Sequence, residues 1–234
     1  MFQYALFDLD GTLTDPKEGI TKSVQFALNQ QGIEEPDLDK LEPFIGPPLK
    51  DSFMKFYGLT DEQALNAIAD YRKRFAPTGI FENEVYPGVP EMLGQLKAAG
   101  VKLAVASSKP EVFVNRILEH FDLAEYFDVV VGSNLDGTRS EKEEVVEEAL
   151  RQLASHGKTE KNVAEAVEIN KITCAMVGDR KFDVQGAREH GLTAVAVAYG
   201  YASEGELEAE GPDYIAETVK QLEQFLLQEG TSVE

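Results

Sequence analysis

The sequence predicts an α/β protein, a doubly wound parallel sheet with a Rossmann-like core and an inserted α-helical domain. Short apolar runs rich in Val, Ile, Ala and Leu alternate with segments of helical periodicity, a pattern typical of parallel strands joined by helices. Polar residues stand where several of these runs end. A long helical stretch also separates the first run from the second, and a simple crossover helix does not need that length.

The predicted strands are short runs, and several of them are apolar on successive residues, as strands covered by helices on both faces require. The runs are residues 4–8, 101–107, 128–132, 172–179 and 193–198. Ligands bind outside the carboxyl ends of the strands in open α/β sheets. Asp8, Ser107 and Asp179 each end a run, so we expect them to converge on one site.

Proline and glycine residues indicate where helices begin and end. A helix over about residues 16–31 has Pro16 in its first turn and Gly32 directly after it. Pro90 and Pro110 open two further helices with apolar side chains at helical spacing. These apolar stripes are expected to be packing faces.

The long helical stretch sets the predicted domain boundaries. Residues 1–14 and 84–234 form the Rossmann-like core, and residues 15–83 form a helical cap inserted after the first strand. Because the insertion directly follows the strand that carries Asp8, we expect it to close over the site. A peripheral helical bundle is the alternative. The polar residues 155–168 are expected to form a variable surface excursion.

The charge of the chain limits its partners. A formal net charge of −20 opposes attraction to nucleic acid or to anionic lipid, so neither is an expected partner. The same charge repels a phosphorylated substrate, and a phosphate site therefore has to supply local cations.

The apolar segments indicate a cytoplasmic protein. No run approaches the roughly 20 residues of a membrane helix, and the first residues lack the basic flank and cleavage site of a secretory signal. Cys174 is the single cysteine, so no intrachain disulfide is possible. Its apolar neighbours predict a buried, inert thiol.

The segment FDLDGTLT carries the most specific signal. Asp8 and Asp10 lie two residues apart at a strand end, and Gly11 follows, which can turn sharply. On a continuing strand the two carboxylates would face the same side. A hard cation such as Mg²⁺ takes oxygen ligands and usually shares them with a phosphate. An ordinary Asp-Gly turn capped by Asp10 is the alternative for this pair alone.

The segment VGDRKFD adds Asp179 and Asp183, about one helical turn apart, so that four acids are expected around one cation. For Arg180 and Lys181 we expect a surface ion-pair role.

The segment SSKP offers hydroxyl and backbone donors at an expected helix start, a favourable place for a phosphate. Helix capping by serine is the alternative.

Taken together, DLDGTLT, a serine after a hydrophobic strand, a lysine before a helix and GDRKFD resemble, in this order, the four motifs of the haloacid-dehalogenase-like hydrolase superfamily. The resemblance runs over essentially the whole chain. FIGPPL and VYPGVPEML are similar to the phosphoglycolate-phosphatase-like branch, whose helical cap is inserted just after the first motif.

The resemblance implies a Mg²⁺-dependent phosphatase that works through an aspartyl phosphate. Asp8 would be the nucleophile, and Asp10 the acid that protonates the leaving alcohol and then activates water. Mg²⁺ would be held by the Asp8 carboxylate, the Asp10 backbone carbonyl and the Asp179 carboxylate, with Asp183 at the ion or just behind it.

The resemblance also implies the residues that bind phosphate. Ser107 would donate to a phosphate oxygen, and Lys142 would neutralise phosphate and nucleophile. Lys109 is the rival lysine, because Glu143 and Glu144 follow Lys142 where the family more often has prolines. Without the motif order, Lys142 would be interpreted as part of a solvated helix face.

Five further residues are predicted to contact the substrate. The GPPLK turn of the cap would present backbone donors and a cation to the leaving group. The residues are Gly11, Thr12, Ser108, Gly46 and Lys50. His120, His156 and His190 lack metal-ligand spacing and receive no role.

The expected partner is a small phosphorylated metabolite, phosphoglycolate-like or a nucleotide, bound by a monomer or homodimer. A phosphomutase of the same fold, a phosphoacceptor module of the response-regulator type and a catalytically silent binding protein are the alternatives. Release of phosphate into water separates the hydrolase from the mutase.

Overall fold

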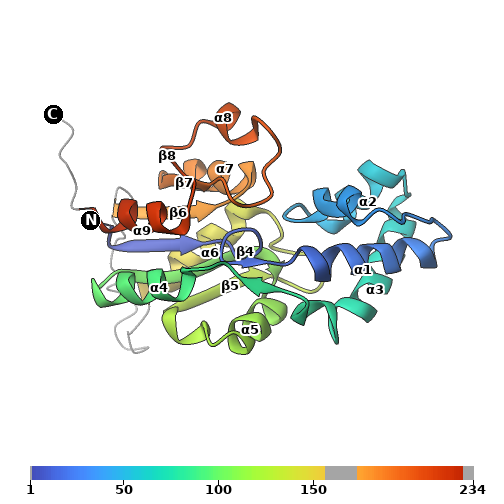
Figure 1. The fold of residues 1–234 in the computed structure, drawn as a ribbon, viewed down its shortest axis with the longest axis horizontal. Coiled ribbons are helices and arrows are strands. Elements are labelled where there is room, and N and C mark those ends of the chain that lie inside the picture. Colours follow the sequence, from blue (N-terminus) through green and yellow to red (C-terminus); the bar gives the residue numbers. More distant parts are fainter. Residues whose placement is uncertain (1, 156–172, 229–234) are drawn as a thin grey trace. The chain divides into compact units, whose positions relative to one another are not determined.

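The computed structural model describes residues 2–155 and 173–228 and divides into two compact units (Figure 1). The inserted unit is Thr14–Val85, and the core unit comprises the described residues before and after it. The predicted cap, residues 15–83, lies within the inserted unit. Apart from Ser155, the predicted excursion over residues 155–168 lies outside the described residues, as does His156.

The core unit contains a six-stranded parallel sheet in the order β5-β4-β1-β6-β7-β8, counted over the described residues. Its strands are β1 (Tyr4–Phe7), β4 (Lys102–Pro110), β5 (Val129–Ser133), β6 (Cys174–Gly178), β7 (Thr193–Val197) and β8 (Tyr214–Ala216). All five predicted runs are strands. The sequence interpretation missed β8, because three residues are too few to show a periodic pattern and only Ala216 of them is fully buried.

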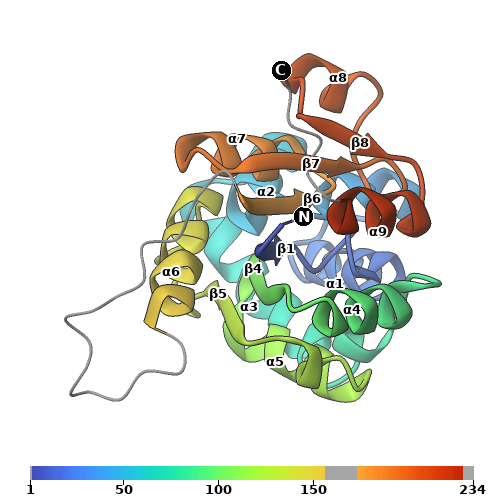
Figure 2. The ribbon, with the colours of Figure 1, turned by 90° about the vertical axis from the view of Figure 1, so that its left-hand side faces the viewer.

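Helices cover both faces of this sheet, which confirms the doubly wound fold. Figure 2 shows α6 and α7 on one face and α4, α5 and α9 on the other. The helices are α4 (Val89–Ala98), α5 (Glu111–His120), α6 (Lys142–Ser155), α7 (Lys181–Glu189), α8 (Glu206–Glu210) and α9 (Val219–Leu227), with the 3₁₀ turn η3 (Ala124–Tyr126). Apolar residues of β4–β7, α6 and α7 form one buried cluster.

The register of the central strands brings the polar strand ends to one level. Phe7 at the end of β1 pairs with Val105 of β4 and with Val177 of β6. Residues one or two positions after these three therefore lie at the same edge of the sheet, beside the strand where the order of connections reverses. Asp8, Ser107 and Asp179 come from this edge.

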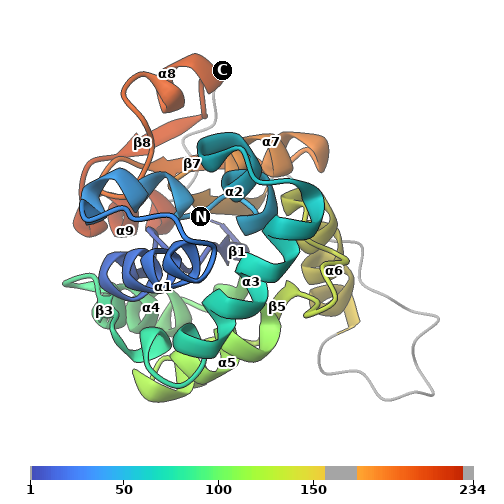
Figure 3. The ribbon, with the colours of Figure 1, turned by 90° about the vertical axis from the view of Figure 1, so that its right-hand side faces the viewer.

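The inserted unit is mainly helical. Figure 3 shows α1 and α3, which pack against each other, together with α2. A two-stranded antiparallel ladder pairs its first and last residues. The elements are β2 (Thr14–Asp15), α1 (Lys17–Gln30), η1 (Leu38–Phe44), α2 (Leu49–Tyr57), α3 (Asp61–Phe75), η2 (Gly79–Phe81) and β3 (Glu84–Val85).

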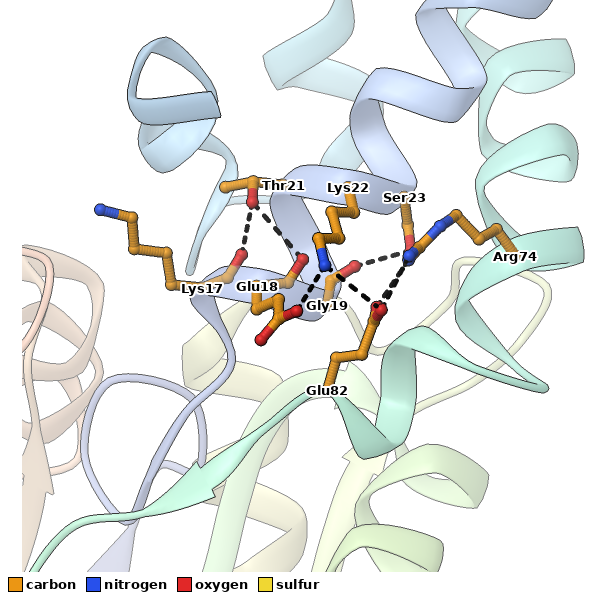
Figure 4. A network of polar contacts seen from close by, with 8 residues as sticks. All are labelled: Lys17, Glu18, Gly19, Thr21, Lys22, Ser23, Arg74 and Glu82. Atoms are coloured by element: carbon orange, nitrogen blue, oxygen red, sulfur yellow. Dashed lines mark hydrogen bonds and ion pairs between the residues drawn. The ribbon is translucent and has the colours of Figure 1, made fainter. Parts of the chain in front are cut away.

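A polar network ties the two ends of the inserted unit (Figure 4). Arg74 donates to both carboxylate oxygens of Glu82, at 2.8 and 2.9 Å, and to the Ser23 hydroxyl at 3.1 Å. The hydrogen bonds from Arg74 hold the pKa of Glu82 below its usual value. Gly19 lies so close to Gly79 that a Cβ on it would be 1.9 Å from the Gly79 carbonyl oxygen. The start of α1, the end of α3 and the segment before β3 are therefore held together by these contacts.

Two predictions from composition concern Cys174 and membrane helices. Cys174 is buried, as predicted, and burial raises the pKa of its thiol to about 12. Over residues 2–155 and 173–228, no helix combines the length and apolar character that crossing a membrane requires.

Candidate active site

Three carboxylates meet at the carboxyl edge of the sheet. Asp8 follows β1, Asp179 follows β6, and Asp183 lies in the first turn of α7. All three are buried, and one oxygen from each lies within 4.8 Å of the others. Mutual repulsion makes such a group costly, so it needs nearby positive charge.

Lys142 at the start of α6 supplies part of that charge. Its Nζ lies 3.0 Å from Asp8 Oδ2 and 2.8 Å from Asp183 Oδ1, and it donates to the Ala106 carbonyl at 3.1 Å. Burial lowers the pKa of an ammonium, but the charges of Asp183 and Asp8 outweigh it and raise the pKa of Lys142 above its usual value. Lys142 is buried, so its interpretation as part of a solvated helix face is wrong.

Lys109, the rival lysine, lies beside the other acid. Its ammonium forms a buried ion pair with the carboxylate of Asp10. Burial raises the pKa of Asp10, and the charge of Lys109 lowers it only in part. The two lysines are thus divided between the two acids of the first motif, with Lys142 at Asp8 and Lys109 at Asp10.

Of the four carboxylates expected around one cation, the structure groups three, those of Asp8, Asp179 and Asp183. Asp10 is not among the carboxylates that approach one another, since its side chain pairs with Lys109. The strand β1 ends at Phe7, so the two-residue alternation of a strand does not apply to Asp8 and Asp10. A role for the Asp10 backbone carbonyl as a metal ligand stays a prediction.

Ser107 lies within β4, which continues to Pro110, and the helix predicted after SSKP begins at the next residue, Glu111. Ser107 is buried, and its hydroxyl accepts a hydrogen bond from the Lys109 N–H at 3.3 Å. Ser108 is half-buried beside it. Hydroxyl donation to a phosphate stays a prediction for both.

Glycine residues surround Asp179 closely. A Cβ on Gly11 would lie 2.1 Å from Asp179 Oδ2, and a Cβ on Gly200 would lie 2.3 Å from Asp179 Cβ. Gly11 also has φ +78°, a backbone conformation that favours glycine. Its neighbour Thr12 is fully buried. The structure therefore gives Gly11 a packing role at Asp179, and its predicted contact with substrate stays a prediction.

The oxygen atoms of this edge fit a hard divalent cation. Burial and then the charges of Asp183 and Asp8 raise the pKa of Asp179 well above its usual value. Within the described residues, Asp179 Oδ1 and Asp10 Oδ1 are buried and have no hydrogen-bond partner. Buried oxygens from several carboxylates are the ligand set that Mg²⁺ takes in proteins.

Arg180 differs from its expected surface role. It is buried, and its guanidinium pairs with Glu206, with Nε 2.9 Å from Oε1. Lys181 is half-buried, and its ammonium lies 5.4 Å from the Phe182 ring centroid. The sequence interpretation missed Glu206, because the pair joins positions 26 residues apart and no local pattern marks it.

The predicted cap contacts, Gly46 and Lys50, belong to the inserted unit, where Lys50 pairs with Asp61. Their contact with substrate stays a prediction. His120 packs edge-on against Phe121, and the His190 ring is bonded to the Glu143 carbonyl.

Comparison with known proteins identifies the family. The protein-family model described as haloacid dehalogenase-like hydrolase matches residues 5–197 of this chain. A protein from Pseudomonas aeruginosa named 5'-nucleotidase is 47% identical over 94% of both chains. Tyrosine-protein kinase PtkA from Mycobacterium tuberculosis is 39% identical over 85% of this chain, which spans 63% of that relative. Proteins named phosphoglycolate phosphatase are among the more distant matches.

The solved structures agree with this result. The crystal structure of a predicted phosphatase from Clostridium acetobutylicum has a TM-score of 0.88 and 46% identity, covering 97% of this chain and 99% of that one. The four sequence motifs, the sheet order and the buried carboxylates thus have one common explanation: the chain belongs to the haloacid dehalogenase-like hydrolase family.

Proposed function

We propose that this protein is a Mg²⁺-dependent phosphatase that hydrolyses a small phosphate monoester through an aspartyl phosphate on Asp8. One observation carries the proposal: Asp8 is held in a buried site between the ammonium of Lys142 and the carboxylates of Asp179 and Asp183. A carboxylate in such a site can attack phosphorus only if the negative charge around it is offset.

The proposed reaction has two steps. In the first, an Asp8 oxygen bonds to phosphorus, the bond from phosphorus to the leaving oxygen breaks, and protonated Asp10 gives its proton to that oxygen. In the second, water attacks the phosphorus of the aspartyl phosphate, the Asp10 carboxylate takes a proton from that water, and inorganic phosphate leaves Asp8. Splitting the transfer in this way makes each step easier.

The residues around Asp8 have distinct roles in this proposal. Lys142 faces Asp8 and offsets the charge of the arriving phosphate, and Ser107 donates to a phosphate oxygen. Asp8, Asp179, Asp183 and the Asp10 carbonyl would hold Mg²⁺, which supplies positive charge against the repulsion between the nucleophile and a phosphate dianion.

For the leaving group we propose a nucleoside, so that the substrate is a nucleoside 5'-monophosphate. The support is the relative named 5'-nucleotidase, which is 47% identical over nearly the whole chain. Phosphoglycolate is the alternative, from the resemblance of FIGPPL and VYPGVPEML to that branch of the superfamily.

Phosphoryl transfer to an acceptor other than water is the second candidate function. The relative named tyrosine-protein kinase favours it, and a phosphomutase is the form in which a sugar accepts the phosphoryl group. A phosphoacceptor module or a silent binding protein would give no turnover at all.

Phosphate release from a panel of nucleoside monophosphates, phosphoglycolate, sugar phosphates and pyrophosphate tests the proposal. We expect release that requires Mg²⁺, is fastest with a nucleoside monophosphate, and is abolished by Asp8→Asn. The control is Asp39→Asn, since Asp39 is an aspartate of the inserted unit whose side chain is 78% exposed.

Substantial phosphate release by Asp8→Asn would contradict the assignment of Asp8 as the nucleophile. An absence of release across the panel, with transfer to an added tyrosine peptide or sugar phosphate, would favour the second candidate.

A further inference from the structure

The loop between β7 and α8 lies directly behind Asp179. The Tyr201 N–H donates to Asp179 Oδ2 at 2.7 Å, and the Tyr199 hydroxyl donates to the Thr12 carbonyl at 3.1 Å. Gly200, between these two tyrosines, approaches Asp179 more closely than any side chain would permit. The loop thus contacts both the first motif and the predicted metal ligand of the fourth.

Glu206, the first residue of α8, ties this loop to the fourth motif. Its Oε1 accepts from Arg180 Nε at 2.9 Å and from the Lys181 N–H at 3.0 Å. Its Oε2 accepts from the second guanidinium nitrogen of Arg180 and from the Ser203 N–H, each at 3.2 Å. The Arg180 and Glu206 side chains are only 10% and 11% exposed, so solvent screens the pair little.

In the sequence, Arg180 and Lys181 lie between Asp179 and Asp183, two of the three carboxylates that the proposal assigns to the metal. The Arg180 N–H donates to Asp183 Oδ2 at 3.0 Å. Glu206 therefore holds the short segment that joins Asp179 to Asp183. It also binds Ser203, which belongs to the same loop as Tyr201, the residue whose N–H donates to Asp179. The Glu206 carboxylate thus joins the segment 180–181 to the loop that contains Ser203.

We propose that Glu206 is a positioning residue of the metal site, which sets the affinity for Mg²⁺ without touching the ion. The inference rests on the proposed function, because that function assigns Mg²⁺ to Asp8, Asp179 and Asp183. Hydrogen-bond partners that orient metal ligands typically change metal affinity by about 10- to 100-fold when they are removed.

Capping of α8 is the simpler role that Glu206 has to be distinguished from. The bond from the Ser203 N–H is of the kind that begins a helix. A residue that only begins α8 would change the stability of the fold and leave the Mg²⁺ affinity of the folded protein unchanged. The two roles therefore separate in a direct measurement of ion binding.

Isothermal titration with Mg²⁺, without substrate and at a temperature where every variant is folded, tests the inference. For Glu206→Ala we expect the Mg²⁺ dissociation constant to rise by about 10-fold or more. Glu206→Gln keeps an acceptor oxygen and loses the charge, so its constant is expected between those of the wild type and Glu206→Ala. Phosphate release by either variant is expected to recover as Mg²⁺ is raised.

Glu210→Ala is the matched control. Glu210 lies on the same short helix and accepts from Gln185 of α7 at 2.9 Å, but this exposed contact does not involve residues 179–181. We expect its Mg²⁺ affinity to equal that of the wild type. Circular dichroism checks the fold of each variant, and Glu206→Gln decides the question if Glu206→Ala is unfolded.

Unchanged Mg²⁺ affinity in the folded Glu206 variants would overturn the inference and leave the proposed function standing. Failure of the wild type itself to bind Mg²⁺ would instead contradict the metal requirement of the proposed function, and this inference with it.

Discussion

Lys142 shows what a single buried ammonium does in a strongly acidic protein. Two carboxylates, Asp8 and Asp183, share it within 3.0 Å, and burial removes the water that would otherwise screen them. Removing one partner of such a group leaves uncompensated buried charge, which costs more than the group contributes when intact.

For Lys142→Ala we expect phosphate release to fall by about 100-fold or more, because one stabilising charge at the transferring phosphate is lost. We also expect a loss of about 3 kcal/mol or more in the free energy of unfolding at neutral pH. Urea unfolding with and without Mg²⁺ measures this loss, and Mg²⁺ should restore part of it by replacing the missing cation.

The pH dependence of that variant checks the cause. Without Lys142, burial and repulsion from Asp8 hold the pKa of Asp183 above the roughly 4 of an unfolded aspartate. The folded state then binds more protons than the unfolded state, so stability should rise as the pH falls from neutral towards about 4.

The control is Lys102→Ala, which removes an exposed ion pair with Asp128 and should lower the free energy of unfolding by at most about 1 kcal/mol. Equal losses in both variants would contradict the buried-charge explanation.

The loop after β7 contributes to the site through its backbone, which lies against Asp179 at Gly200 and Tyr201. Gly200 permits this approach for a steric reason: a Cβ there would lie 2.5 Å from the Gly11 carbonyl oxygen as well as 2.3 Å from Asp179 Cβ. Such distances force backbone to move, because neither contact is with a flexible chain end.

For Gly200→Ala we therefore expect displacement of the loop from Asp179, with Mg²⁺ affinity and phosphate release each reduced by about 10-fold or more. Gly94→Ala is the control in α4, where the nearest atom to a new Cβ is 3.8 Å away on Tyr126. That substitution should raise stability by about 0.5–1 kcal/mol, since glycine weakens a helix interior. Wild-type Mg²⁺ affinity in Gly200→Ala would show that the close approach of this loop to Asp179 is not needed for metal binding.

At the scale of the whole molecule, the net charge of −20 opposes the proposed substrate. The two lysines of the site do not offset it at a distance, because Lys142 and Lys109 each pair with buried carboxylates. On the proposed function, a phosphate dianion is therefore repelled until it reaches the proposed metal and the donors of the site.

We expect kcat/KM for a dianionic ester to rise several-fold as ionic strength increases from about 10 to about 150 mM, with Mg²⁺ kept saturating. The Debye length falls from about 30 to about 8 Å over this range, which screens the protein's overall field more than the contacts inside the site. Turnover at saturating substrate should change little. A fall in kcat/KM would show that a local positive potential governs the approach of substrate.

Most of the fold could be predicted because its signals are local. Five apolar runs indicated five strands of the central sheet, and Pro16, Pro90 and Pro110 each lie within one residue of the first residue of a helix. Asp8, Ser107 and Asp179 were placed together because parallel strands end at one edge. The strand β8 was missed, since a segment of three residues is too short to carry such a signal.

The sequence by itself determined the layered fold and the residue types at the strand ends. Apolar periodicity, and the proline and glycine residues at the ends of elements, are properties of neighbouring residues. Only the tertiary structure decided which lysine faces Asp8, that Asp10 pairs with Lys109, and that Arg180 is buried against Glu206. The physical reason is distance along the chain: Lys109 and Asp10 are 99 positions apart, and Arg180 and Glu206 are 26 apart. Charges so separated in sequence meet only after strand register and helix packing have fixed their positions.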